Sequence, residues 1–537
     1  MKSVDACAAR SVPQPETRQV KNRYTKEGAR RSLVYTVAFR VLSQISTILS
    51  YVVIVRGMTE HDFGVFNLLY GFIPVVGTVV SLGIEQTLRR YQPEYLRTGE
   101  DGHAAWLVRV VASIRFTTTV LVVLLLIGIW NWVAPIFQLG PYRFQFILFS
   151  ALIMLTFQSR ILQLSLASHM MHGYSVGSLA VIPFVKLLAY LALWLTNRFT
   201  LEAAILADTA AYGVGYILLR IVHHLRCRPP PGVKVSAPAK EDRKRMVKYG
   251  LYNNFNDVGS VLLGVRSDNF FIAALLNAVA VGGYAFYTRL NEMVNNASPS
   301  RLFDNVIEPV FFATPPEHAG VRIPRYFTLL LNLNLPLQWA AFAYTAAYHH
   351  EIVATLFDGK FIEWSPLLPL VIAFGLFGVI ATPVTLVAQY AEKAAVILFS
   401  KVAVVYQVIA TLTLIPVIGI YGAAIATGTG TLIKNLIIWW HVRTSARWLN
   451  FRAVLLMSAL IWGPAIGLCI LAKALVPAPM LAHMAFGLVV MSIAGTLYLR
   501  SPAIAESDRE ILGTLLQGRE ARVLQLIGLI RPGAKAA

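Results

Sequence analysis

Basic side chains lie within long apolar segments of this sequence, where a charge is costly. Placing one near the middle of a bilayer costs about 2.5–3.5 kcal/mol on insertion scales, so such a side chain usually faces a cavity or a partner. Lys186 and Lys401 have no acidic residue at helical spacing, which favours a cavity. Arg109, Arg115 and Arg220 lie near segment ends and are expected to extend to the membrane surface. The basic residues left to explain are Arg40, Arg160, Lys186, Arg266, Arg289, Lys401 and Lys434.

Polar residues at helical spacing accompany these charges and form three stripes. Arg289 and Glu292 are one helical turn apart, so they either line a cavity or pair with each other and fix helix packing. Together the stripes predict a hydrophilic central cavity with a net positive charge. The stripes consist of Arg40, Gln44, Thr47 and Tyr51, of Asn253, Asp257, Ser260, Gly264 and Asp268, and of Arg289, Glu292 and Asn296.

Motifs for catalysis, nucleotide hydrolysis or metal binding do not stand out in the sequence. The Gly-Lys pair at 359–360 lacks the rest of a phosphate-binding loop, which argues against ATP hydrolysis. Thr59 is interpreted as the cap of a helix with Asp62 in its first turn. The His-His-Glu segment at 349–351 has no third metal ligand at a recognisable spacing, and three cysteines are too few for a disulfide framework. We therefore expect no cofactor, no metal and no enzymatic reaction.

The composition places these residues in a membrane protein. Of 537 residues, 56% are hydrophobic and only 14% are charged, whereas soluble proteins carry roughly a quarter charged residues. This excludes a soluble multidomain enzyme and a disordered scaffold. A span needs about 20 apolar residues, and by that test the chain is an all-α polytopic protein with about fourteen transmembrane helices. They lie near 33–56, 63–84, 109–136, 144–168, 174–195, 201–222, 248–275, 281–302, 325–348, 366–390, 394–417, 420–440, 453–475 and 479–499.

Lysine and arginine residues in the connecting loops predict the orientation of the spans. Loops on the side of the N-terminus, with both tails, hold roughly 31 of them and the other loops hold about 5, which indicates cytoplasmic termini. This asymmetry also explains the net charge of +20, because basic residues face an anionic leaflet. Nothing resembles a nucleic-acid-binding surface, in which basic and aromatic residues alternate.

Three pairs of similar segments indicate an internal repeat with an offset of about 215–220 residues. One pair is HDFGVFNLLYGF from His61 and VGGYAFYTRLNE from Val281. The others are the Phe-Val-Lys at 184–186 with the Phe-Ser-Lys at 399–401, and FTLEAAI from Phe199 with IYGAAIA from Ile420. The repeat predicts two pseudo-symmetric six-helix bundles with a cleft between them. The predicted parts are a basic cytoplasmic arm 1–32, the bundles 33–225 and 248–442, a cytoplasmic linker 226–247, two additional helices 453–500 and a cytoplasmic amphipathic tail 501–537.

Several segments resemble bacterial polysaccharide flippases, the polysaccharide-transporter branch of the multidrug/oligosaccharidyl-lipid/polysaccharide exporter superfamily. They are RGMTEHDFGVFNLLYGFIPVVGTVVSLGIEQTLRRYQPEY from Arg56, SDNFFIAALLNAVAVGGYAFYTRL from Ser267 and IGIYGAAIATG from Ile418. The residues from Arg289 to Glu292 are also similar to the eighth-span Arg-Leu-x-Glu pattern of the lipid II flippases. The paired arginines in the first span of those flippases are replaced here by Gln44 and Ser50, which favours a different polysaccharide unit as cargo.

The resemblance implies a flippase of the bacterial inner membrane that moves an undecaprenyl-diphosphate-linked oligosaccharide by alternating access. A diphosphate-linked sugar needs cations for its phosphates, and amides or hydroxyls for its sugars. The basic residues of the spans would then bind the phosphates, while Asn253, Asn254 and Asp257 would contact sugar or a coupling cation. A polysaccharide polymerase and its assembly machinery are further expected partners. The alternatives are a multidrug/cation antiporter, a lipid II flippase, and a membrane glycosyltransferase or polysaccharide ligase.

Overall fold

The computed structural model describes residues 26–169, 171–262, 265–298, 316–504 and 509. Within these ranges, the side chains at 26–38, 40, 172, 175–176, 179, 252–266, 316 and 394 are outside the description. Every regular element in the described part of the chain is helical. The amphipathic helix expected in the tail, and most of the basic arm, lie outside the described residues.

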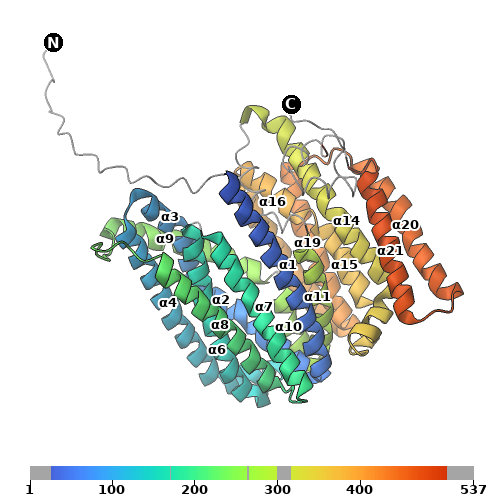
Figure 1. Ribbon diagram of the computed structural model, residues 1–537, viewed down its shortest axis with the longest axis horizontal. Coiled ribbons are helices and arrows are strands. Elements are labelled where there is room, and N and C mark those ends of the chain that lie inside the picture. The colour runs from blue at the N-terminus through green and yellow to red at the C-terminus, as the bar shows by residue number, and fades with distance from the viewer. Residues whose placement is uncertain (1–25, 170, 263–264, 299–315, 505–508, 510–537) are drawn as a thin grey trace, which may run out of the picture.

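The first half of the chain contains eight α-helices and two short 3₁₀ turns. These are α1 (Lys26–Gly57), α2 (Glu60–Ser81), α3 (Ile84–Thr98), α4 (Asp101–Gly128), α5 (Trp130–Val133), η1 (Ala134–Phe137), η2 (Gly140–Tyr142), α6 (Arg143–Ser168), α7 (His172–Leu195) and α8 (Leu201–Arg226). In Figure 1 this half runs from blue to green, and its helices lie roughly parallel to one another. Thr59 caps α2, because its hydroxyl accepts a hydrogen bond from the Asp62 N–H as predicted.

Most helices of the second half continue the parallel arrangement, whereas α9 (Lys240–Leu262) runs across the end of the bundle (Figure 1). After α9, the described elements of this half are α10 (Val265–Leu275), α11 (Ala278–Asn296), α14 (Pro316–Leu356), η3 (Ile362–Trp364), α15 (Leu367–Gly378), α16 (Ala381–Tyr390), α17 (Ala394–Phe399), η4 (Ser400–Val402), α18 (Ala403–Ile418) and α19 (Ile420–Val442). The last two helices, α20 (Phe451–Leu475) and α21 (Met480–Arg500), pack against α14 at the edge of the molecule.

The all-α polytopic fold expected from the sequence is confirmed. In the described part of the chain, eight helices are long and apolar enough to cross a membrane. Two shorter apolar stretches, Val41–Gly57 and Ala180–Leu195, belong to α1 and α7. The total of about fourteen spans stays a prediction.

Helix packing follows the same order in the two halves. In the first half α1 and α8 pack against α7, α6 packs against α8, and α4 packs against α6. In the second half the corresponding pairs are α10 with α18, α18 with α19, α15 and α16 with α19, and α14 with α15. The halves meet along α2 and α11. These helices are so close that a side chain at position 64, which is a glycine, would overlap the Ala278 carbonyl. Packing of this kind is what the internal repeat predicts.

Two segments expected to be connections are partly helical. Residues after the second span form α3, which follows Gly83 in a left-handed conformation. Leu88, Tyr91 and Tyr95 are buried on one side of this helix, which packs on α4 and α9. The linker expected at 226–247 is shorter, because α9 begins at Lys240 within its charged run. The sequence pattern missed both starts, since amphipathic helices at a membrane surface lack the long apolar run that marks a span.

Candidate functional site

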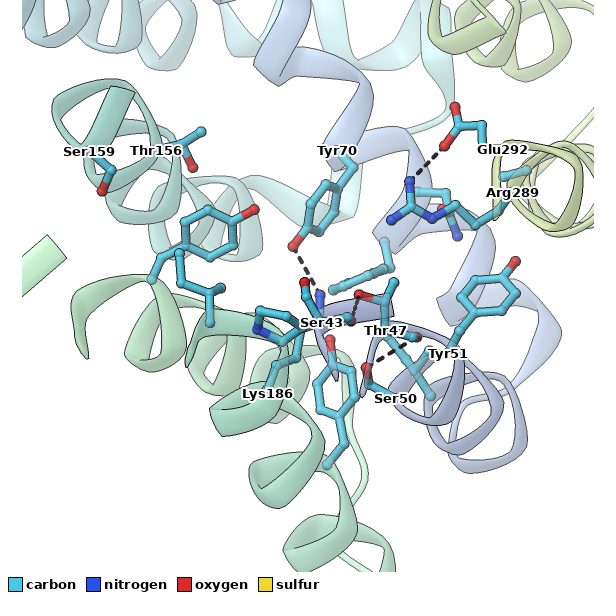
Figure 2. A pocket seen from close by; sticks show the side chains of 18 of the residues that line it. Ser43, Thr47, Ser50, Tyr51, Tyr70, Thr156, Ser159, Lys186, Arg289 and Glu292 are labelled. Atoms are coloured by element: carbon cyan, nitrogen blue, oxygen red, sulfur yellow. Dashed lines mark hydrogen bonds and ion pairs between the residues drawn. The ribbon is translucent and has the colours of Figure 1, made fainter. Parts of the chain in front are cut away.

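A cavity of about 650 Å³ lies mainly within the first half and extends to α10 and α11 of the second. Figure 2 shows its polar side chains: hydroxyls of Ser43, Thr47 and Ser50 come from α1, and Tyr70 comes from α2. The charged groups come from α7 and α11 and, beyond those labelled in the figure, from α3, α4 and α6. Helices from both halves therefore contribute to one polar cavity.

Four of the charged residues predicted from the sequence line this cavity. They are Arg160, Lys186, Arg289 and Glu292, which come from α6, α7 and α11. Three apolar helices thus direct charged side chains into the same space. Such an arrangement is what the cost of isolated intramembrane charges requires.

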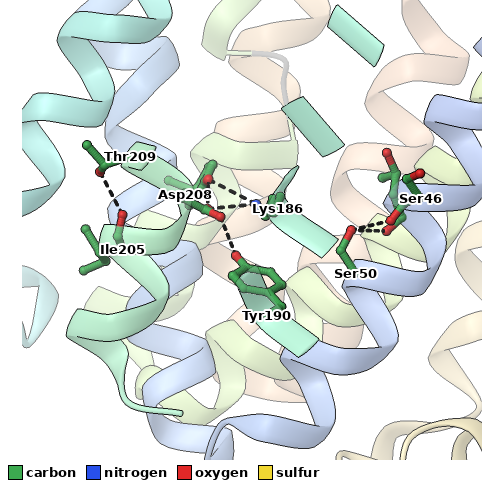
Figure 3. Close-up of polar contacts among 9 residues, drawn as sticks. Ser46, Ser50, Lys186, Tyr190, Ile205, Asp208 and Thr209 are labelled. Atoms are coloured by element: carbon green, nitrogen blue, oxygen red, sulfur yellow. Dashed lines mark hydrogen bonds and ion pairs between the residues drawn. The ribbon is translucent and has the colours of Figure 1, made fainter. Parts of the chain in front are cut away.

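Lys186 has an acidic partner that the sequence pattern missed. Its Nζ lies 2.8 Å from Asp208 Oδ2, and the Asp208 side chain is completely buried in α8 (Figure 3). Tyr190 donates a hydrogen bond of 2.6 Å to the other carboxylate oxygen, and Tyr70 donates one to Oδ2. Both oxygens of the carboxylate therefore have hydrogen-bond partners. Lys186 lines the cavity, and its charge is balanced by the buried carboxylate of Asp208, which does not line the cavity.

The geometry of the α7–α8 hairpin explains this pair. Lys186 lies as many residues before Asn197 as Asp208 lies after it, and Asn197 is in the turn between the two helices. Residues equidistant from the turn of an antiparallel hairpin stand at the same level. A search for acids at mirrored positions across each hairpin would have found Asp208, whereas a search at spacings within one helix could not.

Arg289 and Glu292 combine the two interpretations that the sequence leaves open. Arg289 Nη1 lies 2.6 Å from Glu292 Oε2, so the residues are paired within α11. Their side chains are nevertheless 38% and 37% exposed and line the cavity (Figure 2). Because the pair is partly solvated, a phosphate that enters the cavity can compete for the guanidinium, which is a strong donor to phosphate oxygens.

Arg115 does not extend to the membrane surface, which corrects the sequence-based interpretation. The residue is 2% exposed, and its guanidinium lies 3.2 Å from Glu85 and stacks 4.2 Å from the centre of the Phe157 ring. Glu85, in the first turn of α3, also lies 3.7 Å from Arg160. The missed helix α3 therefore supplies the carboxylate that holds both arginines at the cavity.

The charged lining of the cavity is net positive. Among the described residues, four basic side chains and two carboxylates line it, namely Arg115, Arg160, Lys186 and Arg289 against Glu85 and Glu292. If the carboxylate of Asp208 behind Lys186 is included, one positive charge remains. The charge of the described lining therefore has the sign that the sequence predicts, but the cavity lies mainly within the first half and not in a cleft between the two halves.

The stripe on α1 faces α11. Gln44 donates a hydrogen bond of 3.3 Å to the Met293 carbonyl, and the Tyr51 hydroxyl donates one of 3.1 Å to the Phe286 carbonyl. Gln44 thus joins the two halves and is not among the cavity-lining residues, whereas Tyr51 is. The predicted side chains of Arg40, Asn253, Asn254, Asp257 and Arg266 lie outside the described side chains.

Lys401 and Lys434 lie in the second half, away from the cavity lining. Lys401 is in η4, which packs on α19, the helix that carries Lys434. The structure therefore does not bring these two residues together with Lys186 and Arg289. No group of three or more metal-ligating side chains occurs within the described ranges.

The α1–α2 turn lies at one end of the bundle, which is here called the outer end after the predicted orientation. At this end, basic side chains of each half contact the carbonyl end of a helix in the other half. Lys360 donates to the Val55 and Arg56 carbonyls, each at 2.8 Å, and to the Met58 carbonyl. Arg56 in turn donates to the carbonyls of Thr355 and Leu356 at the end of α14. Each cation caps the carbonyl end of a helix from the other half, where the helix dipole favours it.

Comparison with known proteins adds the family and the fold. Residues 29–312, more than half of the chain, match the family described as polysaccharide biosynthesis protein. Comparison with curated sequences gives no match.

Two solved structures share the fold over most of the chain. One is the lipid II flippase MurJ in an inward closed conformation (TM-score 0.64, 10% identity, covering 86% of this chain and 99% of that one). The other is an inward-facing multidrug resistance MATE family transporter of the MOP superfamily (TM-score 0.61, 12% identity, covering 77% and 98%). These neighbours are a flippase and a transporter rather than enzymes. With its helical bundles, its polar cavity and its family match, this chain belongs to the polysaccharide biosynthesis protein family of multi-pass membrane proteins.

Proposed function

We propose that this protein is a flippase that moves undecaprenyl-diphosphate-linked oligosaccharide repeat units across the bacterial inner membrane, for exopolysaccharide, capsule or O-antigen synthesis. Both termini lie in the cytoplasm in this proposal, as the distribution of basic residues indicates. The observation that carries the proposal is the net-positive cavity formed by α-helices of both halves.

The cavity suits both parts of such a cargo. Arg160, Lys186 and Arg289 offer charge-assisted hydrogen bonds to a diphosphate. Hydroxyls of α1, α2 and α6 and the amides of Asn67 and Gln163 are available for sugar hydroxyls. Because the guanidinium of Arg289 is already oriented by Glu292, part of the ordering cost of binding is removed before the cargo arrives.

Alternating access is supported by where the halves touch. At the outer end they are joined by the helix-end contacts of Lys360 and Arg56. At the opposite end Gly83 meets the backbone of Gly250, where a side chain would overlap its carbonyl, and Thr87 donates to the Met246 carbonyl. Both sets of contacts are small and local, so rocking of the halves about the α2–α11 contact would exchange them.

The positive lining disfavours a multidrug/cation antiporter, whose cavity should be rich in carboxylates. The replacement of first-span arginines by Gln44 and Ser50 disfavours lipid II as cargo, even though the lipid II flippase shares the fold. A glycosyltransferase or ligase would need a catalytic acid at an extended outer loop, and the described outer loops are short. A polysaccharide polymerase would receive the flipped units as a partner in the outer leaflet.

The test is a flipping assay in a strain from which the gene has been deleted. Lipid-linked repeat units should accumulate on the inner leaflet, and the wild-type protein should restore their transfer. Arg289→Gln should reduce transfer at least about tenfold, because a cavity cation that contacts a phosphate is worth more than 1.4 kcal/mol. The matched control is Arg452→Gln, which removes an exposed arginine on α20 outside the cavity.

Each alternative gives a different outcome in the same strain and with purified protein. Transfer of sugar by purified protein without flipping would establish the enzyme, and drug efflux with an intact surface polysaccharide would establish the antiporter. Full transfer by Arg289→Gln together with an Arg160→Gln variant at wild-type protein levels would refute the cavity as the cargo site.

A further inference from the structure

A second cavity, of about 450 Å³, lies at the inner end of the first half and plays no part in the proposed cargo path. It is enclosed by α3, α4, α6 and α8 and by the residues that follow α8. Helix α6 lines both cavities with opposite faces: Arg160 and Gln163 face the first, while Ile161 and Ser165 face the second. The two spaces are therefore separate.

The rim of this second cavity is basic. Arg109 of α4, Arg220 of α8 and Arg228 after α8 line it. Asp101 is the one carboxylate among the described lining residues, whose charged side chains together carry two positive charges. Arg109 and Arg220 are exposed, and within the described residues neither forms an ion pair with an acid. Two guanidinium groups that are not used by the protein itself are suited to a phosphate, which they can bind in a bidentate manner.

A buried network of polar side chains lines the cavity, and one acceptor atom of this network has no hydrogen-bond donor among the described residues. Gln92 is fully buried, and its Nε2 donates a hydrogen bond of 2.8 Å to Ser165 Oγ. Ser165 Oγ in turn lies 3.0 Å from His223 Nε2. Gln92 Oε1 has no hydrogen-bond partner in the described part of the chain. Because buried polar atoms are nearly always paired, this carbonyl points to a ligand that brings a hydroxyl donor.

The surroundings of the cavity are those of a lipid-facing surface. Helix α6 packs against both α4 and α8, which form the sides of the cavity. Towards the middle of these helices the apolar side chains of Phe116 and Ile217 are exposed. A phosphate held by Arg109 and Arg220 would therefore sit at the membrane boundary, with apolar surface beside it. Basic pockets between transmembrane helices at the cytoplasmic surface commonly bind anionic headgroups.

We propose that this second cavity binds an anionic phosphate ester that carries a hydroxyl group, such as the phosphoglycerol headgroup of a membrane lipid. Arg109 and Arg220 hold the phosphate, and Gln92 Oε1 accepts a hydrogen bond from the hydroxyl. The site is independent of the cargo cavity, so its occupancy does not depend on the proposed function.

Cys227 provides a local reporter of occupancy, since it lines this cavity. Burial raises the pKa of its thiol to about 11, so alkylation by a maleimide is slow and sensitive to further shielding. The full-length protein would carry Cys7→Ser, and the remaining Cys469 is completely buried. The alkylation rate is measured in an uncharged detergent at about pH 8.5 with added phosphatidylglycerol, with phosphatidylcholine, or with soluble glycerol phosphate.

Phosphatidylglycerol is expected to slow alkylation at least about fivefold, and Arg109→Gln with Arg220→Gln should remove this protection because both phosphate donors are lost. The matched pair Arg97→Gln with Arg452→Gln, which removes exposed arginines outside the cavity, should keep it. Protection by the lipid alone assigns a lipid headgroup, and equal protection by glycerol phosphate assigns a soluble phosphate ester. Equal effects of phosphatidylcholine, no protection in the wild type, or protection that survives the double substitution would overturn the proposal.

Discussion

Two buried aspartates, one in each half, are held in different ways. Asp208 of α8 accepts hydrogen bonds from Tyr70 and Tyr190 and pairs with Lys186. Asp268 of α10 accepts hydrogen bonds from Tyr284 at 2.6 Å, from Thr427 at 2.5 Å and from Gln407 at 3.3 Å, and among the described residues it has no cationic partner. Both carboxylates are completely buried.

The two clusters occupy related places in the repeat. Tyr70 is on α2 and Tyr284 is on α11, the two helices that the internal repeat pairs. The carboxylate, however, comes from the last helix of the first bundle and from the first helix of the second. Each cluster thus joins a tyrosine of one of these two paired helices to a carboxylate on another helix of the same half.

The two clusters differ in whether the buried carboxylate is paired with a cation or only with neutral hydrogen-bond donors. In the first half the carboxylate neutralises a cavity-lining ammonium, so the cluster fixes a charged wall that faces the cavity. In the second half hydroxyl and amide donors satisfy the carboxylate without a basic side chain. Removing one charge should therefore be costly in the first cluster and mild in the second, because an unpaired buried charge costs more than a lost neutral hydrogen bond.

The largest effect is expected for Asp208→Asn. It leaves the Lys186 ammonium without its counter-charge and should lower the stability of the folded protein by about 3–5 kcal/mol. Thermal unfolding of the purified protein in detergent measures the loss as a fall in the midpoint temperature. Asp242→Asn, at an exposed position of α9, is the matched control and should leave the midpoint within error. A midpoint equal to wild type for Asp208→Asn would show that the pair contributes nothing.

A smaller effect is expected when both charges are removed together. For Lys186→Met with Asp208→Asn, the loss of unfolding free energy should be smaller than the sum of the two single losses by at least about 2 kcal/mol. In the double variant both charges are gone, so no unpaired charge remains. The four proteins of this cycle are compared by the same unfolding midpoints. If the double variant is as stable as wild type but flips poorly, Lys186 acts on cargo and not only on packing. Additive losses would contradict direct coupling.

The sequence predicts the charged cavity better than it predicts the partners of the charges. Apolar segment length identifies the spans, and the cost of intramembrane charge identifies Lys186, Arg160 and Arg289 as residues that need an explanation. Glu292, the partner of Arg289, is one turn away on the same helix and can be found from the spacing. The partners of Lys186 and Arg160 are Asp208 and Glu85, which lie on other helices, so no spacing within one helix reveals them.

Arg115 is a further residue whose carboxylate partner on another helix the sequence pattern did not reveal. Its distance from the end of the segment predicts that it reaches the surface, but α3 follows Gly83 and brings Glu85 to within 3.2 Å of it. The tertiary partner overrides the local expectation. Lys401 resembles Lys186 in its sequence context and yet lies outside the cavity, because η4 places it beside α19 instead.

The smallest effect is expected for Asp268→Asn. The amide oxygen of asparagine can still accept a hydrogen bond from Tyr284 or Thr427, and a hydroxyl can rotate to accept from the new NH₂ group. The loss should therefore be about 1 kcal/mol, the net value of one hydrogen bond, and clearly less than that of Asp208→Asn in the same unfolding assay. Because each substitution replaces one carboxylate oxygen by an amide NH₂ group at a fully buried site, the ratio of the two losses isolates the contribution of the Lys186 charge. Equal losses would mean that burial alone, and not the presence of a cation, sets the cost of altering these carboxylates.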